Sequence, residues 1–218
     1  LLRAAHAAAQ RQEHARAVDL VRRGGLDPLR LSPEQARAHA EVLLLAVHAF
    51  METHQVAEGD AILAALAQGA REAGDTLLAD RVLVERSFLD VYARGAAGLD
   101  AAALEAAAAR LPPSKSLGRA HYTLGMHARL TGDLDEARRQ LTRAEAVWAE
   151  QGLAGSRASA LDLLGSLAWR AGHPQQALSH AYPKPQPTPC DPRLSPPSQT
   201  LVRMLGLLED VTPRMLRL

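Results

Sequence analysis

The pair Gly132-Asp133 interrupts a stretch of sequence that otherwise has the periodicity of an α-helix. Apolar residues recur at helical spacing on both sides of the pair. Glycine readily adopts the left-handed backbone conformation that ends a helix, and an aspartate side chain accepts hydrogen bonds from the free N–H groups that begin the next one. The pair therefore predicts a turn between two helices.

The same layout recurs later in the chain at a fixed offset. Three landmarks repeat 40 residues apart: Gly125 and Gly165, Gly132 and Gly172, Ala137 and Ala177. A fixed period indicates a repeated helix-turn-helix unit that cannot bury its apolar face alone. We therefore expect an all-α fold, an α-solenoid of antiparallel helix hairpins with about nine or ten helices.

Five such units are predicted in residues 1–181. Gly95 and Gly98 mark the turn of the third unit, Pro112 stops its second helix, and Ser32 followed by Pro33 marks the start of a helix in the second unit. The units span residues 1–25, 33–74, 78–111, 118–152 and 158–181.

The composition changes abruptly after the last unit. Residues 182–198 hold seven of the 13 prolines, which favours extended polyproline II structure over helix. We interpret this segment as a linker or docking strand, followed by a short terminal helix or tail in residues 199–218. One hypothesis for the proline-rich segment is self-association, in which it binds the groove of its own or a neighbouring copy.

The unit at 118–152 resembles a tetratricopeptide repeat. The residues that carry the resemblance are Leu124, Gly125, Ala128, Gly132, Ala137, Leu141 and Ala144. The unit at 158–181 matches through Leu164, Gly165, Ala168, Gly172 and Ala177. With a period near 40 residues, the units are similar to those of bacterial regulatory and signalling proteins of this family.

The resemblance implies that the first helix of each hairpin lines a concave groove that binds a protein or peptide segment. Carried over position by position, it gives these groove candidates: Leu44, His48, Met51, Ser87, Val91, Arg94, Arg119, Tyr122, Met126, Arg129, Ser159, Asp162, Ser166 and Trp169. Chaperone-binding members clamp a carboxylate with Lys and Asn, but Tyr122 with Met126 and Asp162 with Ser166 stand at those positions. We therefore expect apolar anchors and arginine, without that clamp.

A second interpretation applies to the aromatic groove candidates. Aromatic residues at helical spacing are often part of the core, so Tyr122 and Trp169 could instead pack between hairpins.

Charge and hydropathy exclude several classes of partner. The net charge of +1 offers no bulk field for nucleic acid, and Arg138, Arg139 and Arg143 have acidic neighbours at ion-pair spacing, so we do not expect direct nucleic-acid binding. The longest apolar run, residues 42–47, is too short for a membrane helix. The single cysteine, Cys190, excludes an intramolecular disulfide, and we expect a cytoplasmic protein.

No catalytic, cofactor or metal motif is present. The nine histidines form no HExxH pair, and the glycines match neither a dinucleotide-binding nor a P-loop pattern. The sequence therefore predicts no enzyme, no cofactor and no metal site.

Two functions remain open. The first is a non-catalytic scaffold that binds a partner segment in the groove. The second is a sensor or regulatory region cut from a larger bacterial transcriptional regulator or signalling protein, which is suggested by the repeat length and by a sequence that starts at Leu1 rather than Met.

Overall fold

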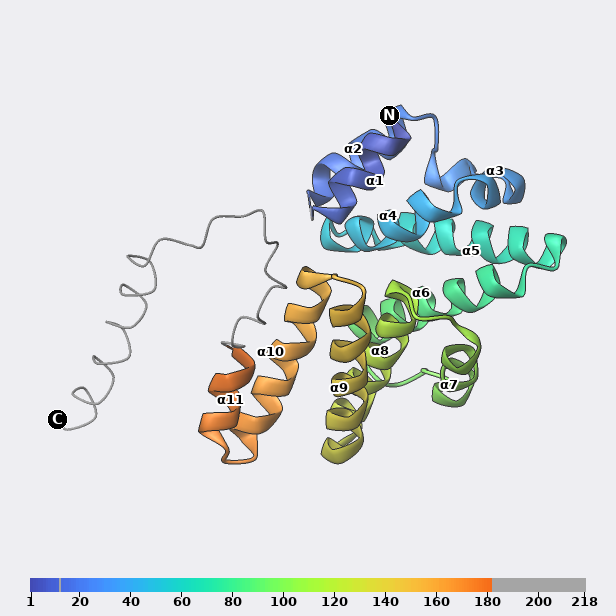
Figure 1. Ribbon diagram of the computed structural model, residues 1–218. Coiled ribbons are helices and arrows are strands. Elements are labelled where there is room, and N and C mark those ends of the chain that lie inside the picture. The colour runs from blue at the N-terminus through green and yellow to red at the C-terminus, as the bar shows by residue number, and fades with distance from the viewer. Residues whose placement is uncertain (12, 182–218) are drawn as a thin grey trace, which may run out of the picture. The chain divides into compact units, whose positions relative to one another are not determined.

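The computed structural model describes residues 1–11 and 13–181, and every regular element in them is a helix (Figure 1). The predicted proline-rich linker at 182–198 and the terminal helix at 199–218 lie outside the described residues. The α-helices are α1 (Leu2–Gln10), α2 (His14–Arg23), α3 (Pro33–Ala38), α4 (Ala40–Glu52), α5 (Val56–Ala73), α6 (Thr76–Arg94), α7 (Ala101–Arg110), α8 (Lys115–Thr131), α9 (Leu134–Glu150), α10 (Ala154–Arg170) and α11 (Pro174–Ala181).

The described residues hold eleven α-helices and one 3₁₀ helix, Pro28–Arg30, so the prediction of nine or ten was low. The second unit accounts for part of the difference, because it contains three helices rather than two. Its first helical stretch breaks at His39, whose backbone leaves the helical range at φ −118° and ψ 24°.

The turns that the repeat predicts are present. Gly132 has a left-handed backbone with φ 92°, and the Asp133 side chain accepts a hydrogen bond from the N–H of Glu136 at 2.9 Å. Gly172, one period later, has φ 78°. The prediction of a helix–turn–helix at Gly132-Asp133 and of its repetition is confirmed.

Short polar side chains fix the starts of five helices. Each side chain accepts a hydrogen bond from the backbone N–H three residues further on, which satisfies a donor that the helix leaves free. The capping residues are Ser32, Asp75, Asp100, Ser114 and Asp133. The helix start predicted from Ser32 and Pro33 is confirmed, and Ser32 also forms a full capping box with Gln35.

Most helices pack against close neighbours along the chain. The pairs α4–α5, α6–α7, α8–α9 and α10–α11 form hairpins, and the second helix of each of the first three contacts the first helix of the next. Among the first helices, α4 contacts α6 and α6 contacts α8. In Figure 1, α8 to α11 lie side by side in chain order. The buried apolar residues accordingly form four clusters rather than one.

Glycine and alanine set how closely the repeated hairpins pack. Gly125 on α8 lies against Leu141 on α9, and a Cβ added to it would stand 2.7 Å from Leu141 Cγ. At the equivalent Gly165, an added Cβ would meet its nearest atom, the Ala177 carbonyl oxygen, at 3.4 Å. The α8–α9 pair therefore needs glycine more strictly than the α10–α11 pair does.

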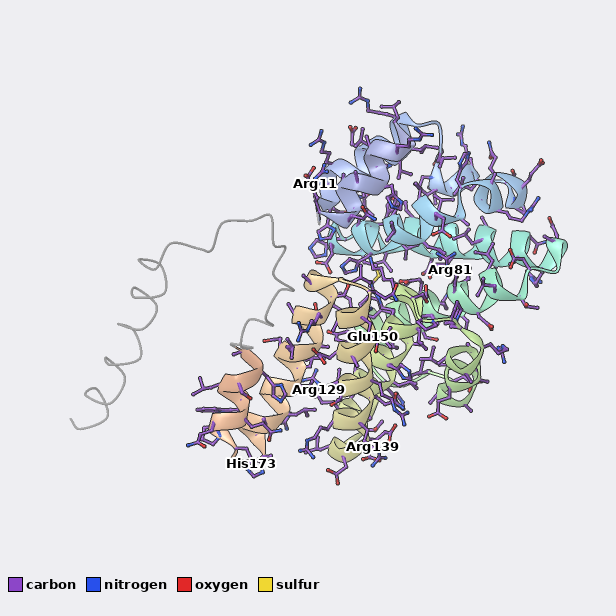
Figure 2. All side chains as sticks on the ribbon, in the orientation of Figure 1. Arg11, Arg81, Arg129, Arg139, Glu150 and His173 are labelled. Carbon is purple, nitrogen blue, oxygen red and sulfur yellow. The ribbon has the colours of Figure 1, made fainter. Side chains whose placement is uncertain are left out.

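Charged residues on α9 are mostly paired within the helix or with its neighbour. Arg139 pairs with Glu136, Arg138 pairs with Asp135, and Arg157 of α10 donates to Glu145 of α9 at 2.6 Å. In Figure 2, Arg139 lies toward the end of α9 that follows the Gly132-Asp133 turn, and Glu150 lies toward the other end of α9. Of the described helices, none is long and apolar enough to cross a bilayer.

The unequal glycine contacts predict opposite effects of one substitution. Gly125→Ala should lower the melting temperature, because overpacking costs about 1–3 kcal/mol and outweighs a gain of about 1 kcal/mol in helix propensity. Gly165→Ala, the matched control, should keep or raise it. Thermal unfolding followed by circular dichroism measures both, and equal shifts in the two variants would contradict the assigned packing.

Candidate functional site

A cavity lies where the first helices of successive hairpins meet. It has a volume of about 610 Å³ and is lined by residues of α1, α2, α4, α6, α8, α9 and α10. A volume between about 300 and 1,000 Å³ is typical of sites for small organic molecules. This cavity is the candidate functional site, and we call it the inner cavity.

Helical spacing explains how several side chains reach the inner cavity. Phe88 and Tyr92 are four residues apart on α6, while Lys115, Arg119 and Tyr122 follow one another by four and three residues on α8. Residues at these spacings share one face of a helix. The cavity is therefore lined by one face of each of these helices.

A row of aromatic rings crosses the inner cavity from helix to helix. The successive ring-centroid distances are 5.3 Å for His14–His48, 6.0 Å for His48–Phe88, 6.2 Å for Phe88–Tyr122 and 5.5 Å for Tyr122–Trp148. Distances of about 4.5–7 Å are those of favourable aromatic pairs. The row joins α2, α4, α6, α8 and α9 through one continuous contact.

Trp148 on α9 reaches this row because the facing residue on α8 is a glycine, Gly118. A Cβ at Gly118 would overlap the indole ring. The Trp148 indole N–H donates to the Lys115 carbonyl at 3.2 Å, which fixes the ring against the start of α8. The indole is therefore both buried and hydrogen-bonded.

Arg119 is the most unusual side chain of the site. It is only 7% exposed, and its guanidinium lies 4.1 Å from the centroid of the Phe88 ring, which is a cation–π contact. Its Nε is buried without a hydrogen-bond partner, and no ion pair to Arg119 is found among the described residues. The guanidinium of Arg119 thus lines the cavity with no ion-pair partner among the described residues.

Burial and nearby cations also shift the neighbouring titratable groups. The pKa of Lys115 is lowered, first by burial and then by the charge of Arg119, while Glu85 acts in the opposite direction. The pKa of His48 is lowered to about 3 by burial, with further contributions from Arg119, His14 and Lys115. His48 is therefore neutral at neutral pH.

Three acidic groups lie near the site, and two of them, Glu52 and Glu41, accept hydrogen bonds from other side chains. Glu52 accepts a hydrogen bond from the Tyr92 hydroxyl at 3.3 Å. Glu85 is only 6% exposed and lines an adjoining cavity of about 270 Å³, together with Glu41, Lys115 and Arg119. Glu41 there is held by Arg81, which keeps the pKa of the Glu41 carboxyl lowered.

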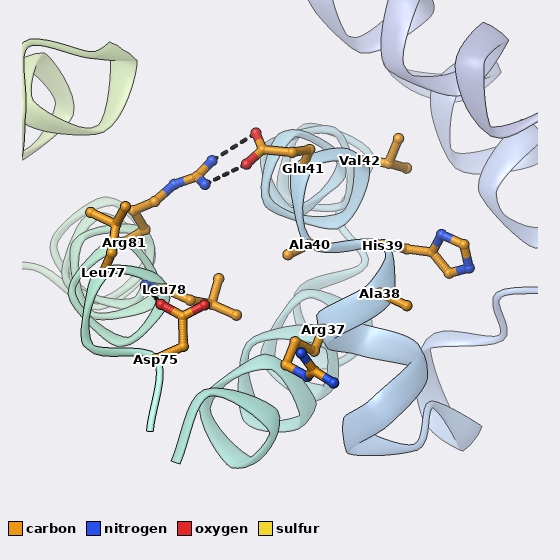
Figure 3. A pocket seen from close by; sticks show the side chains of 10 residues that line it. All are labelled: Arg37, Ala38, His39, Ala40, Glu41, Val42, Asp75, Leu77, Leu78 and Arg81. Atoms are coloured by element: carbon orange, nitrogen blue, oxygen red, sulfur yellow. Dashed lines mark hydrogen bonds and ion pairs between the residues drawn. The ribbon is translucent and has the colours of Figure 1, made fainter. Parts of the chain in front are cut away.

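Another cavity, of about 420 Å³, lies between the α3–α4 junction and the start of α6. Figure 3 shows Arg81 and Glu41 facing each other across it, with Arg81 donating to Glu41 Oε2 at 2.8 Å. Asp75 in its wall caps α6 through the N–H of Leu78. Both carboxylates of this cavity already have partners, so we regard it as a contact between hairpins rather than a binding site.

The inner cavity brings together only part of the predicted groove set. His48, Arg119, Tyr122 and Ser159 line it, and Leu44 lines the adjoining cavity although it is 6% exposed. The other candidates lie elsewhere or are buried in the core. Met51, Ser87 and Val91 are buried, Met126, Arg129 and Ser166 are half-buried, Asp162 and Trp169 are exposed, and the Arg94 side chain lies outside the described part of the chain.

The two interpretations of the aromatic candidates, groove lining and packing between hairpins, apply differently to Tyr122 and Trp169. Tyr122 packs between hairpins, as the alternative interpretation expected, and it also lines the inner cavity. Trp169 is 68% exposed and does not pack between hairpins. Ser159 and Trp169 are ten residues apart, which is about 15 Å along a helix, and only Ser159 reaches the cavity.

Sequence reasoning missed several lining residues, namely His14, Phe88, Tyr92, Lys115 and Trp148. Phe88 follows the predicted Ser87 directly, so a rotation of one residue, about 100° around the helix, separates the two. The spacing of Phe88 and Tyr92 carries the signal that would have found this face.

A scan against protein-family models finds no match to the chain. A search of curated proteins finds no match either.

The lowered pKa of His48 predicts how stability depends on pH. Between pH 6.5 and about 3 the unfolded chain binds a proton at His48 that the folded chain does not, so the free energy of unfolding falls as the pH is lowered. The loss attributable to this group is up to about 1.4 kcal/mol per pH unit. Chemical denaturation of wild type and His48→Gln across this range measures it, and equal pH slopes for the two proteins would contradict the assignment.

Proposed function

We propose that the chain is a non-catalytic scaffold, a tetratricopeptide-like right-handed α-solenoid that binds a partner protein segment along the inner face of its first helices. The observation that carries this proposal is the shared cavity. Side chains of α4, α6, α8 and the start of α10, the first helices of four successive hairpins, all line it. A surface built from one helix of each hairpin is continuous from one repeat to the next.

The packing pattern supports the solenoid part of the proposal. Contacts of a second helix with the next first helix recur at α5–α6, α7–α8 and α9–α10. Repeat proteins stack in this way, because each unit covers the apolar face of its neighbour. The repeat of Gly125, Gly132 and Ala137 one period later gives the same indication from the sequence.

The chemistry of the inner face supports the binding part. Aromatic side chains and arginine supply most of the energy in protein interfaces, since they bury a large area and donate several hydrogen bonds. Phe88, Tyr122 and Arg119 supply these groups within one cavity. An extended segment or a short helix with an apolar side chain and an acidic neighbour would complement them.

Nucleic acid is a weaker candidate partner. Arg138 and Arg139 on α9 are already paired with Asp135 and Glu136, so they do not form an open basic patch. A protein that binds the phosphate backbone depends on accessible, unpaired cations.

The alternative function is a sensor or regulatory region of a bacterial transcriptional regulator or signalling protein. The volume of the inner cavity favours this alternative, because about 610 Å³ suits a small molecule as well as a side chain. The two functions differ in the ligand that the same cavity accepts.

A blocking substitution tests the scaffold proposal. Ser159 is exposed and lines the cavity, so Ser159→Trp should fill the groove without disturbing the core. Peptides selected from a displayed library on the wild-type protein should then lose at least about ten-fold in affinity, or about 1.4 kcal/mol. Fluorescence polarisation measures the affinity.

The matched control for this experiment is Ala146→Trp, on an exposed position of the second helix α9. It should bind the selected peptides as wild type does. Peptides that bind the Ser159→Trp variant with unchanged affinity, or the absence of any selected peptide, would contradict the scaffold proposal.

A further inference from the structure

The buried Nε–H of Arg119 lacks a hydrogen-bond acceptor among the described residues. A guanidinium stays protonated in proteins, so it cannot become neutral when it is buried as a lysine or histidine can. Phe88 covers one face of this guanidinium, but a ring face offers no acceptor in the plane of the N–H groups. The Nε–H is buried and has no hydrogen-bond partner.

A buried, unpaired charge is costly unless an opposite charge or a hydrogen-bond acceptor reaches it. The nearby acidic groups do not supply this. Glu52 accepts from Tyr92. Glu85 lines the adjoining cavity with Arg119 and Lys115, but no hydrogen bond or ion pair between the two side chains Glu85 and Arg119 is found among the described residues. Lys115 adds a further cationic donor to the lining of the same cavity.

The lining of the inner cavity is also apolar and aromatic. Tyr122, Trp148 and Leu153 line the cavity and pack in one cluster with buried alanines. A ligand that fills the cavity therefore meets both cationic donors and aromatic rings.

We propose that the inner cavity binds a small organic acid, in which a carboxylate or phosphate monoester receives hydrogen bonds from Arg119 and Lys115 while an aromatic or other apolar body packs against Tyr122 and Trp148. This proposal does not rest on the binding of a protein segment, since it follows from the buried Nε of Arg119 and the aromatic lining of the inner cavity. It supplies the chemical class of ligand that a sensor role would need.

Simple probes test the site in the full chain. The variant Trp169→Phe removes the exposed indole and leaves Trp148, in the cavity wall, as the fluorescent reporter. Phenylacetate and phenyl phosphate should change its emission with saturation in the micromolar to millimolar range. Phenylacetamide, which lacks the charge, should bind at least about ten-fold more weakly, equivalent to about 1.4 kcal/mol.

The two acids also separate the ligand chemistries. Tighter binding of phenyl phosphate assigns the site to a phosphate monoester, and tighter binding of phenylacetate assigns it to a carboxylate. Either result supports the proposal. No saturable change with either acid, or equal binding of phenylacetamide, would overturn it.

Arg119→Met supplies a second, independent readout. It should abolish the preference for the acids over phenylacetamide, and the ligand-free variant should melt no lower than wild type, because an unpaired buried charge is removed. A clear drop in melting temperature would show that Arg119 is satisfied within the protein and would contradict the proposal.

If Arg119→Met fails to fold, Ser156→Phe tests the same site from its other side. Ser156 is half-buried at the start of α10 and lines the inner cavity, and the added ring would occupy the space of the ligand. Binding of the acids should be lost while Arg119 is retained. Undiminished binding would overturn the proposal, and the peptide measurements with Ser159→Trp would report separately on the scaffold function.

Discussion

The close approach of paired helices at small residues is the constraint on which the rest of the structure depends. Gly125 allows α8 to lie directly against Leu141 of α9, and the left-handed Gly132 between them reverses the chain with a turn of two residues. A larger residue at either position would separate the helices or lengthen the turn. Because the same residues recur one period later, the chain forms similar hairpins in succession, and each buries its apolar face against a neighbour.

The candidate site is a consequence of this stacking. When first helices lie side by side, side chains spaced by three or four residues on each of them face one shared space. Phe88 on α6 and Tyr122 on α8 meet there, although they are far apart in sequence. The stacking also encloses Arg119, which no single hairpin would bury. Burial of this cation therefore arises from tertiary packing, and it would give the proposed scaffold a preference for ligands that carry an acidic group.

Much of the fold was predictable because it is encoded locally. Glycine turns and side-chain caps such as Ser32 and Asp133 act within a few residues of the chain. The sequence alone therefore predicted where the helices of these hairpins begin and end. The break at His39 has no comparable local signal. The site was predictable only in part, since its residues are selected by the rotation of each helix and by neighbours distant in sequence. Phe88 differs from its predicted neighbour by one residue, and Trp148 reaches the cavity only because Gly118 makes room for it.

The central claim is that the chain is a one-dimensional stack of hairpins rather than a domain with one core. Native-state hydrogen exchange, read hairpin by hairpin, tests it most directly. The division of the buried residues into four clusters, three of which share contacts with Tyr122, predicts graded opening free energies, with α10–α11 opening more readily than the large cluster around α4, α5 and α6. A single opening free energy shared by α4 to α11 would contradict the stack and the groove derived from it.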